Sequence, residues 1–326
     1  MIVDVSAGNG ADATYTVSYS DEHPHPGSIA YKDRGTDPAL NTQIILRRVD
    51  AGTYLMGSPE SELGRSQTGS ERQHLVVLTN DFYLGIVPVT SAQYTNVWPG
   101  AWTDEYANQQ SPLPVQKVNW SEVRGTPCAT TDVAADSFLG LLRARTTDGA
   151  ALPAGYVFDL PTEAQWEYAC RAGTETAWNN GTDFSTNSVG VDANLALLGR
   201  YSPVGSGGIA ACHSKVGRLQ PNAWGLYDCH GGVGEIVADN MEYDGAEASP
   251  GAVTEPVGGV CTADSYVHRR LRGGCYTYCW AVHMRSAASR HSNQYDNKGK
   301  TAEESGTMWH GVRFAFIRPR TGGEWK

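Results

Sequence analysis

The 326-residue sequence has no excess of basic residues, no long apolar run and few cysteines. Its 25 lysines and arginines stand against 35 aspartates and glutamates, a formal charge of −10. This balance argues against a nucleic-acid-binding face, which would be basic. No apolar run approaches the roughly 18 residues of a membrane span. Seven cysteines, an odd number, are too few for a disulfide-built scaffold and leave at least one thiol outside any internal pair.

The remaining composition is that of a loop-rich globular protein. Only 18% of residues are charged and 40% are hydrophobic, and glycine, proline, tyrosine and tryptophan are plentiful. The first residues, Met1 to Asp4, lack the basic and then apolar pattern of a secretory signal. We therefore leave the compartment open: cell-surface or secreted if a signal has been removed, otherwise cytoplasmic.

Short β-rich runs separated by turn residues follow one another along the chain. Gly8-Asn9-Gly10 predicts a hairpin between two N-terminal strands, and residues 21–42 are typical of a polar linker. The predicted division is an N-terminal β extension with linker over 1–42 and one domain over 43–326. Residues 44–46 and 52–57 are interpreted as paired strands, residues 75–78 and 82–84 as two more, and residues 58–74 as a charged, exposed loop. The clearest later strands are 269–278 and 312–317.

Two helices are predicted from their capping residues. Thr90 is expected to cap a helix reaching Val97. Thr162 and Gln165 form the pattern of a capping box, and Gly173 lies where a left-handed residue closes the helix.

Seven ordered motifs carry a family resemblance. They are Leu160-Pro161-Thr162-Glu163-Ala164-Gln165-Trp166-Glu167-Tyr168, Leu271-Arg272-Gly273-Gly274, Gly311-Val312-Arg313-Phe314-Ala315, and residues 51–58, 82–85 with 89–90, 114–120 and 221–228. Together they resemble the formylglycine-generating enzyme (sulfatase-modifying factor) family over roughly residues 44 to 318.

The resemblance implies an α+β protein with a C-type lectin-like fold of the formylglycine-generating-enzyme type. Two helices stand beside small twisted antiparallel sheets and much irregular loop, and calcium is often bound. The family includes copper-dependent formylglycine-generating oxidases, iron-dependent sulfoxide synthases and non-enzymatic binders. Among the binders are the variable proteins of diversity-generating retroelements, which place hypervariable residues near the C-terminus. No His-x3-His pattern at helical spacing supports the iron class.

The oxidase interpretation depends on two thiolates, because soft sulfur ligands select Cu(I). In the family these cysteines lie five positions apart after an Arg-Gly-Gly-Ser-Tyr string. Here Cys275 replaces that serine, Cys279 lies one place past the first copper position, and no cysteine fills the second. Copper on Cys275 and Cys279 is the alternative interpretation, and buried packing of two apolar thiols is the other.

Two calcium sites and one disulfide position are also implied by the resemblance. Asn194 and Leu195 match the start of one calcium site, although Asn194 is equally well explained as a turn residue. Glu235 is the surviving acidic residue of the other site, where Gly232 replaces an asparagine. Cys170 matches a cysteine that is disulfide-bonded in some relatives, but Ser286 stands at the partner position. We expect a buried thiol at Cys170.

Residues 275–310 are rich in side chains suited to recognition, since tyrosine and tryptophan give large rigid contact areas. The predicted ligand-binding residues are Tyr276, Tyr278, Trp280, His283, His291, Asn293, Tyr295, Asp296, Trp309 and His310. Packing of the irregular loops is the alternative role for these aromatics. Arg272, Arg285 and Arg313 are framework positions of the family, so we expect structural ion pairs or carbonyl contacts from them.

The sequence therefore predicts a non-catalytic recognition protein with a C-terminal surface for a protein or glycan ligand. A copper-dependent oxidase acting on a substrate cysteine is the alternative, and a purely structural module is the third interpretation.

Overall fold

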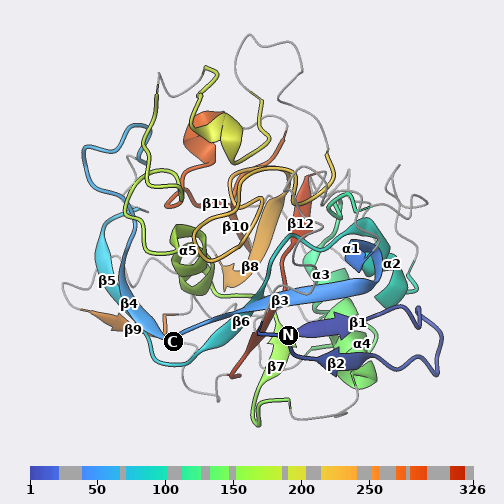
Figure 1. The fold of residues 1–326 in the computed structure, drawn as a ribbon. Helices are drawn as coiled ribbons and strands as arrows, with labels where there is room; N and C mark the ends of the chain where they lie inside the picture. The colour runs from blue at the N-terminus through green and yellow to red at the C-terminus, as the bar shows by residue number, and fades with distance from the viewer. Residues whose placement is uncertain are drawn as a thin grey trace.

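The protein is described here by a computed structural model. The described residues are 1–21, 39–66, 71–100, 112–125, 133–146, 152–185, 190–202, 214–240, 252–256, 269–276, 280–291 and 309–319. They form three sheets with short helices between and above them (Figure 1).

The largest sheet has six strands in the order β2-β1-β3-β6-β13-β7, all paired antiparallel. They are β1 (Ile2–Asp4), β2 (Thr16–Ser18), β3 (Gln43–Val49), β6 (Phe82–Gly85), β7 (Val157–Asp159) and β13 (Ala315–Ile317). The predicted N-terminal hairpin is confirmed, with Gly8 at a positive φ of 73° in its connection. Because β1 also pairs with β3, the hairpin continues the sheet, and Val3 is fully buried in its core.

Two smaller sheets complete the architecture. One has the order β11-β10-β8-β12 and the other β4-β5-β9, each with one parallel pair. Their strands are β4 (Gly52–Met56), β5 (His74–Leu78), β8 (Gly234–Asn240), β9 (Val253–Thr254), β10 (Arg269–Arg272), β11 (Arg290–His291) and β12 (His310–Val312). The predicted pairing of residues 44–46 with 52–57 is wrong. Both edges of β3 are occupied by β1 and β6, so β4 pairs with β5 instead.

The two predicted helices are confirmed, together with their caps. They are α2 (Ser91–Val97) and α5 (Glu163–Arg171), and each begins with a capping box, built on Thr90 and on Thr162. The short helices α1 (Ala39–Thr42), α3 (Trp120–Val123) and α4 (Phe138–Arg145) and the 3-10 turns η2 (Leu195–Leu197) and η3 (Ala281–His283) were not expected. Within the described parts of the chain, none of the helices has the length and apolarity for crossing a bilayer.

Three hydrophobic clusters hold these elements together. In the first, α2 and α4 cover one face of the six-stranded sheet. Phe138 stacks between Tyr94 and Phe314, with ring centroids 5.1 and 4.6 Å apart. The second packs α5 between the sheets around Trp166. The third lies under η2 and η3 and consists of Ala177, Trp178, Leu195, Leu198, Tyr201, Cys275, Ala281 and Met284. Three of its members, Cys275, Ala281 and Met284, belong to the 275–310 stretch predicted for recognition.

Candidate functional site

The turns η2 and η3 lie together at the top of the molecule (Figure 1), and the segments around them carry exposed apolar side chains. We call these side chains the upper surface. They are Leu63, Val191, Leu197 and Trp280, between 43% and 54% exposed. Large apolar side chains are also exposed singly on ordinary protein surfaces, so these four mark a candidate surface by their position around η2 and η3.

The geometry of η3 explains why Trp280 faces outward. Ala281 and Met284 have no exposed surface and anchor the turn in the third cluster. The Trp280 ring stacks on the His283 ring, with centroids 5.7 Å apart and planes at 22°. The Trp280 backbone N–H donates to His283 Nδ1 at 3.0 Å. The alternation of buried and outward side chains therefore presents an aromatic pair on a fixed turn.

Arg285 ties this turn to the loop between β4 and β5. Its guanidinium donates to Glu62 at 2.6 Å, to Glu71 at 2.7 and 2.8 Å, and to the Gly64 carbonyl oxygen at 2.7 Å. The prediction that residues 58–74 form an exposed charged loop is therefore wrong for these carboxylates, because they turn inward to meet a buried cation. Burial raises the pKa of Glu62, while Arg285 acts in the opposite direction. Leu63, between the anchored residues, is left on the surface.

Arg272 and Arg313 make the same kind of contact deeper in the core. Arg272 pairs with Glu167 at 2.5 Å and donates to the Ser286 carbonyl oxygen at 2.6 Å. Although burial opposes ionisation, Arg171 and Arg272 hold the pKa of Glu167 below its ordinary value. The ion pairs and carbonyl contacts predicted for Arg272, Arg285 and Arg313 are confirmed.

Arg313 pairs with Glu235 at 2.7 and 2.9 Å and also donates to the carbonyl oxygens of Gly85 and Tyr227. Glu235 accepts a further hydrogen bond from the Trp166 indole N–H. Neither side chain of the ion pair has exposed surface. The residue predicted as a calcium ligand thus lies in a saturated ion pair.

The other residues predicted for calcium are also engaged. The Asn194 amide donates to the Asp183 carbonyl oxygen at 2.8 Å, and the Leu195 carbonyl oxygen accepts from the N–H groups of Leu198 and Gly199. Over the described ranges, no group of three or more His, Cys, Asp or Glu side chains has a metal-binding arrangement. Calcium at Asn194, Leu195 and Glu235 stays a prediction.

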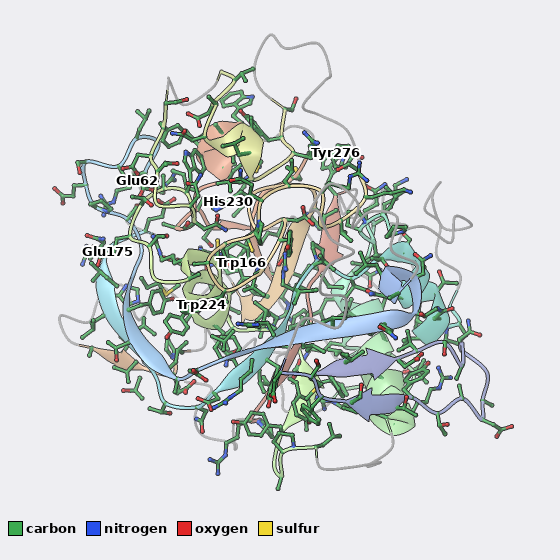
Figure 2. All side chains as sticks on the ribbon, in the orientation of Figure 1. Glu62, Trp166, Glu175, Trp224, His230 and Tyr276 are labelled. Carbon is green, nitrogen blue, oxygen red and sulfur yellow. The ribbon has the colours of Figure 1, made fainter. Side chains whose placement is uncertain are left out.

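The remaining predicted ligand residues fall into three groups. Tyr276 is half-buried and its hydroxyl lies 3.3 Å from Gln116 Oε1, while Trp309 packs against the third cluster. Figure 2 shows Tyr276 and Glu62 on opposite sides of the upper part of the molecule, with His230 between them. His310 is buried in β12, where burial and Arg290 lower its pKa to about 3. Outside the described residues, or described by backbone alone, are Tyr278, His291, Asn293, Tyr295 and Asp296.

Of the two thiols in the copper alternative, only Cys275 is among the described residues. It is 7% exposed and belongs to the third cluster, beside Met284. Cys279 lies outside the described residues, so the geometry of the pair is not tested.

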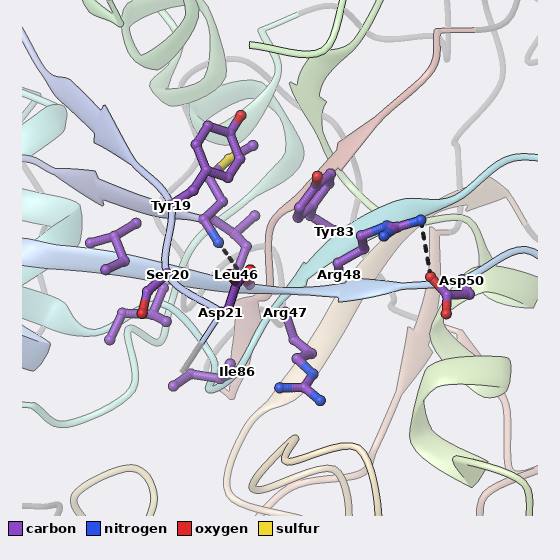
Figure 3. Close-up of a pocket in the computed structure, with 12 residues that line it drawn as sticks. Tyr19, Ser20, Asp21, Leu46, Arg47, Arg48, Asp50, Tyr83 and Ile86 are labelled. Carbon is purple, nitrogen blue, oxygen red and sulfur yellow. Dashed lines mark hydrogen bonds and ion pairs between the residues drawn. The ribbon is translucent and has the colours of Figure 1, made fainter. Parts of the chain in front are cut away.

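A pocket of about 420 Å³ lies away from the upper surface, beside the N-terminal hairpin (Figure 3). Arg47 and Tyr83 point away from each other there, and Arg48 pairs with Asp50 at 3.3 Å. None of the residues predicted for binding or catalysis lines this pocket.

Sequence reasoning did not find Leu63, Val191 or Leu197. Leu63 is a single apolar residue between Glu62 and Gly64, and Leu197 belongs to the apolar run 195–198, whose sequence does not tell which leucine faces solvent.

The chain is similar to a protein family, to several proteins of known sequence and to solved structures. A family model described as a sulfatase-modifying factor enzyme 1-like domain matches residues 33–315. The serine/threonine-protein kinase pkn1 of Chlamydia caviae is 28% identical over 243 residues, covering 73% of this chain and 33% of that protein. The formylglycine-generating enzyme of Mus musculus is 24% identical over 264 residues, covering 72% of this chain and 66% of the enzyme. The chain thus spans about a third of the chlamydial relatives and two thirds of the murine one.

Two solved structures share the fold. PvdO from Pseudomonas aeruginosa has a TM-score of 0.55 at 21% identity, covering 85% of this chain and 95% of its own. Treponema denticola variable protein 1 has a TM-score of 0.56 at 20% identity, with coverage of 84% and 95%. These likenesses agree with the predicted α+β fold of the C-type lectin-like kind.

Proposed function

The chain belongs to the family of sulfatase-modifying factor enzyme 1-like domains, and from this premise we propose that it is a non-catalytic recognition protein. Its ligand, a protein or a glycan, binds at the upper surface and at residues of the 275–310 stretch that adjoin it. Fold alone does not assign activity within such a family, so the proposal rests on the site.

The observation that carries the proposal is the setting of Trp280. The side chain is 44% exposed and stacked on His283, and the turn beneath it is fixed by Met284 in the core and by Arg285. Exposed tryptophan on a rigid base is the typical anchor of a binding hot spot, because little side-chain entropy is lost when the partner arrives.

Other residues of the upper surface support the same function. Leu63 and Leu197 supply apolar area from two other segments, and the Glu62 carboxylate beside Leu63 is already paired with Arg285, as is Glu71. A surface with an apolar centre and no unpaired buried charge is suited to a partner that also desolvates. A variable protein with the same fold, from Treponema denticola, is consistent with recognition on this scaffold.

The experiment is binding of the biotinylated chain to a glycan array and to an array of purified protein ectodomains. Any binder is then titrated against Trp280→Ala and Tyr19→Ala. Tyr19 is a matched control, since it is 45% exposed but lies beside the N-terminal pocket. We expect Trp280→Ala to weaken binding by about 30-fold or more, the effect of a 2 kcal/mol hot spot, and Tyr19→Ala to leave it unchanged. Equal affinities of the two variants would contradict the proposal.

Copper chemistry on Cys275 and Cys279 is tested on the same protein. The competing oxidase requires Cu(I) bound one-to-one and lost in both Cys275→Ser and Cys279→Ser, with oxygen consumption on a cysteine-containing sulfatase peptide. The packing of Cys275 among apolar side chains supports a structural thiol instead, for which neither substitution changes copper binding.

A further inference from the structure

Two asparagine–glycine pairs lie in exposed turns. Asn9 and Gly10 belong to the connection between β1 and β2, and Asn180 and Gly181 to the turn that follows Trp178. All four residues of the two pairs are exposed. An asparagine before glycine is chemically labile, because glycine has no side chain to hinder the backbone nitrogen that attacks the asparagine side chain. The chain therefore carries the same reactive pair in two different settings.

The Asn180 pair is held by hydrogen bonds of its own turn. The Asn180 side-chain carbonyl oxygen accepts from the Thr182 N–H at 3.2 Å and from the Thr182 hydroxyl at 2.6 Å. The Gly181 N–H, which belongs to the attacking nitrogen, donates to the Trp178 carbonyl oxygen at 3.2 Å. The attack requires this nitrogen to lose its proton and the side chain to turn toward it. These three hydrogen bonds therefore oppose the reaction.

The Asn9 pair has a freer backbone. Within the residues that the structure describes, the Gly10 N–H donates no hydrogen bond, and no atom lies within 4 Å of the point where a Cβ would stand on Gly10. The Asn9 side chain is held by a contact from Nδ2 to the Thr95 carbonyl oxygen of α2 at 3.0 Å. This contact is exposed, and a single hydrogen bond of this kind contributes little net free energy. The Asn9 side chain can therefore turn toward Gly10.

We propose that Asn9 is a site of spontaneous deamidation and that Asn180, in the same asparagine–glycine pair, is protected. The Gly10 nitrogen loses its proton to solvent and attacks Asn9 Cγ, so that a new C–N bond forms; the side-chain nitrogen takes up a proton and leaves as ammonia. Water then adds to either carbonyl carbon of the resulting succinimide and breaks its bond to the ring nitrogen. The product is aspartate or isoaspartate at position 9. One water is consumed and one ammonia is released, with no oxidation or reduction.

The modification changes how the N-terminal hairpin is attached to the helices. A carboxylate has no N–H, so the hydrogen bond to the Thr95 carbonyl oxygen is lost in both products. The Asn9 main-chain carbonyl oxygen accepts from the Arg145 guanidinium at 3.0 Å. In isoaspartate the main chain runs through Cβ and Cγ, so this carbonyl leaves the main chain. The reaction thus alters two contacts that join the hairpin to α2 and α4.

The test follows both sites in the full folded chain, incubated near neutral pH. Samples are digested with pepsin at acidic pH, which prevents further deamidation. Mass spectrometry then detects the replacement of the amide by a carboxyl group at positions 9 and 180, and a protein isoaspartate methyltransferase labels the isoaspartate product. We expect Asn9 to react at least about tenfold faster than Asn180, because the hydrogen bonds of Asn180 and Gly181 must break before attack.

Three controls separate the effect of the fold from that of the local sequence. In urea, where both turns are unfolded, the two rates should become similar, because glycine supplies the attacking nitrogen in both. Thr182→Val removes the hydroxyl donor and should speed the reaction at Asn180 alone, whereas Gly10→Ala should slow the reaction at Asn9 alone. Circular dichroism checks that both variants are folded. Equal rates at Asn9 and Asn180 in the folded chain would overturn the proposal, and so would a difference that persists in urea.

Discussion

The buried pair of Arg313 and Glu235 offers a sharp test of how this protein is held together. Arg313→Met removes a guanidinium that donates to Glu235 and to two carbonyl oxygens, while keeping a side chain of similar length. Glu235 would then be left in the interior with the Trp166 indole as its remaining donor among these contacts.

Breaking a buried ion pair on one side costs about 3–5 kcal/mol, because the partner is left charged and desolvated. The loss of two carbonyl contacts acts in the same direction, so we expect the free energy of unfolding to fall by an amount in this range. That is a large share of the 5–15 kcal/mol typical of a folded domain, and the variant should unfold at clearly lower denaturant.

A surface pair at nearly the same N–O distance, joined by one hydrogen bond where the buried pair has two, provides the control. Arg48 and Asp81 are 2.6 Å apart, against 2.7 Å for Arg313 and Glu235, but their side chains are 58% and 35% exposed. Exposed pairs contribute about 0–1 kcal/mol, so Arg48→Met should leave stability nearly unchanged. Because the two N–O distances are nearly the same, distance does not explain a difference in stability between the two variants.

The assay is urea unfolding followed by tryptophan fluorescence, with the double variant Glu235→Gln/Arg313→Met included. The double variant should be more stable than Arg313→Met alone, because no uncompensated charge remains. Equal losses for Arg313→Met and Arg48→Met, or a double variant less stable than the single one, would refute the reasoning.

Two further predictions concern a buried acid and a helix cap. Burial raises the pKa of Asp228 to about 6, although the Gly217 N–H acts against it; the folded protein therefore holds a proton that the unfolded chain releases. Roughly 3 kcal/mol of stability, present below about pH 4, should be lost as the pH rises through 6, and Asp228→Asn should remove that dependence in thermal melts at pH 4.5 and 8. Thr162→Ala removes the acceptor of the Gln165 N–H at the start of α5 and should cost about 1 kcal/mol in urea unfolding. Unchanged melts or an unchanged midpoint would contradict the respective prediction.

Features encoded within a few residues were predictable from the sequence. The capping box at Thr162 and the left-handed Ala172 and Gly173 define α5 locally, and the chain forms that helix. Helix α4 was missed because its segment from Phe138 is largely buried and interrupted by Gly140, so it shows no clear polar face. The pairing of β3 with β6 was missed because strand partners are chosen by the whole fold.

The residues of the candidate site likewise fall into those that the sequence predicted and those that only the fold revealed. A structural role for Arg285 followed from its framework position, but its acidic partner, Glu71, is 214 residues away along the chain. Trp280 was predicted as a contact residue, whereas Leu63 joined it only once the fold placed its loop beside η3. Distant partners of this kind carry no local pattern in one sequence.

The anchoring of the β4–β5 loop by Arg285 has a consequence for how this protein can change over time. The guanidinium reaches the Gly64 backbone and two inward carboxylates, so the path of the loop is specified from below and not by the residues that face solvent. Substitutions at outward positions such as Leu63 or Trp280 leave those contacts in place. The scaffold therefore separates the path of this loop from the chemistry of the side chains that face solvent, so we expect outward substitutions to change the surface without a matching loss of stability.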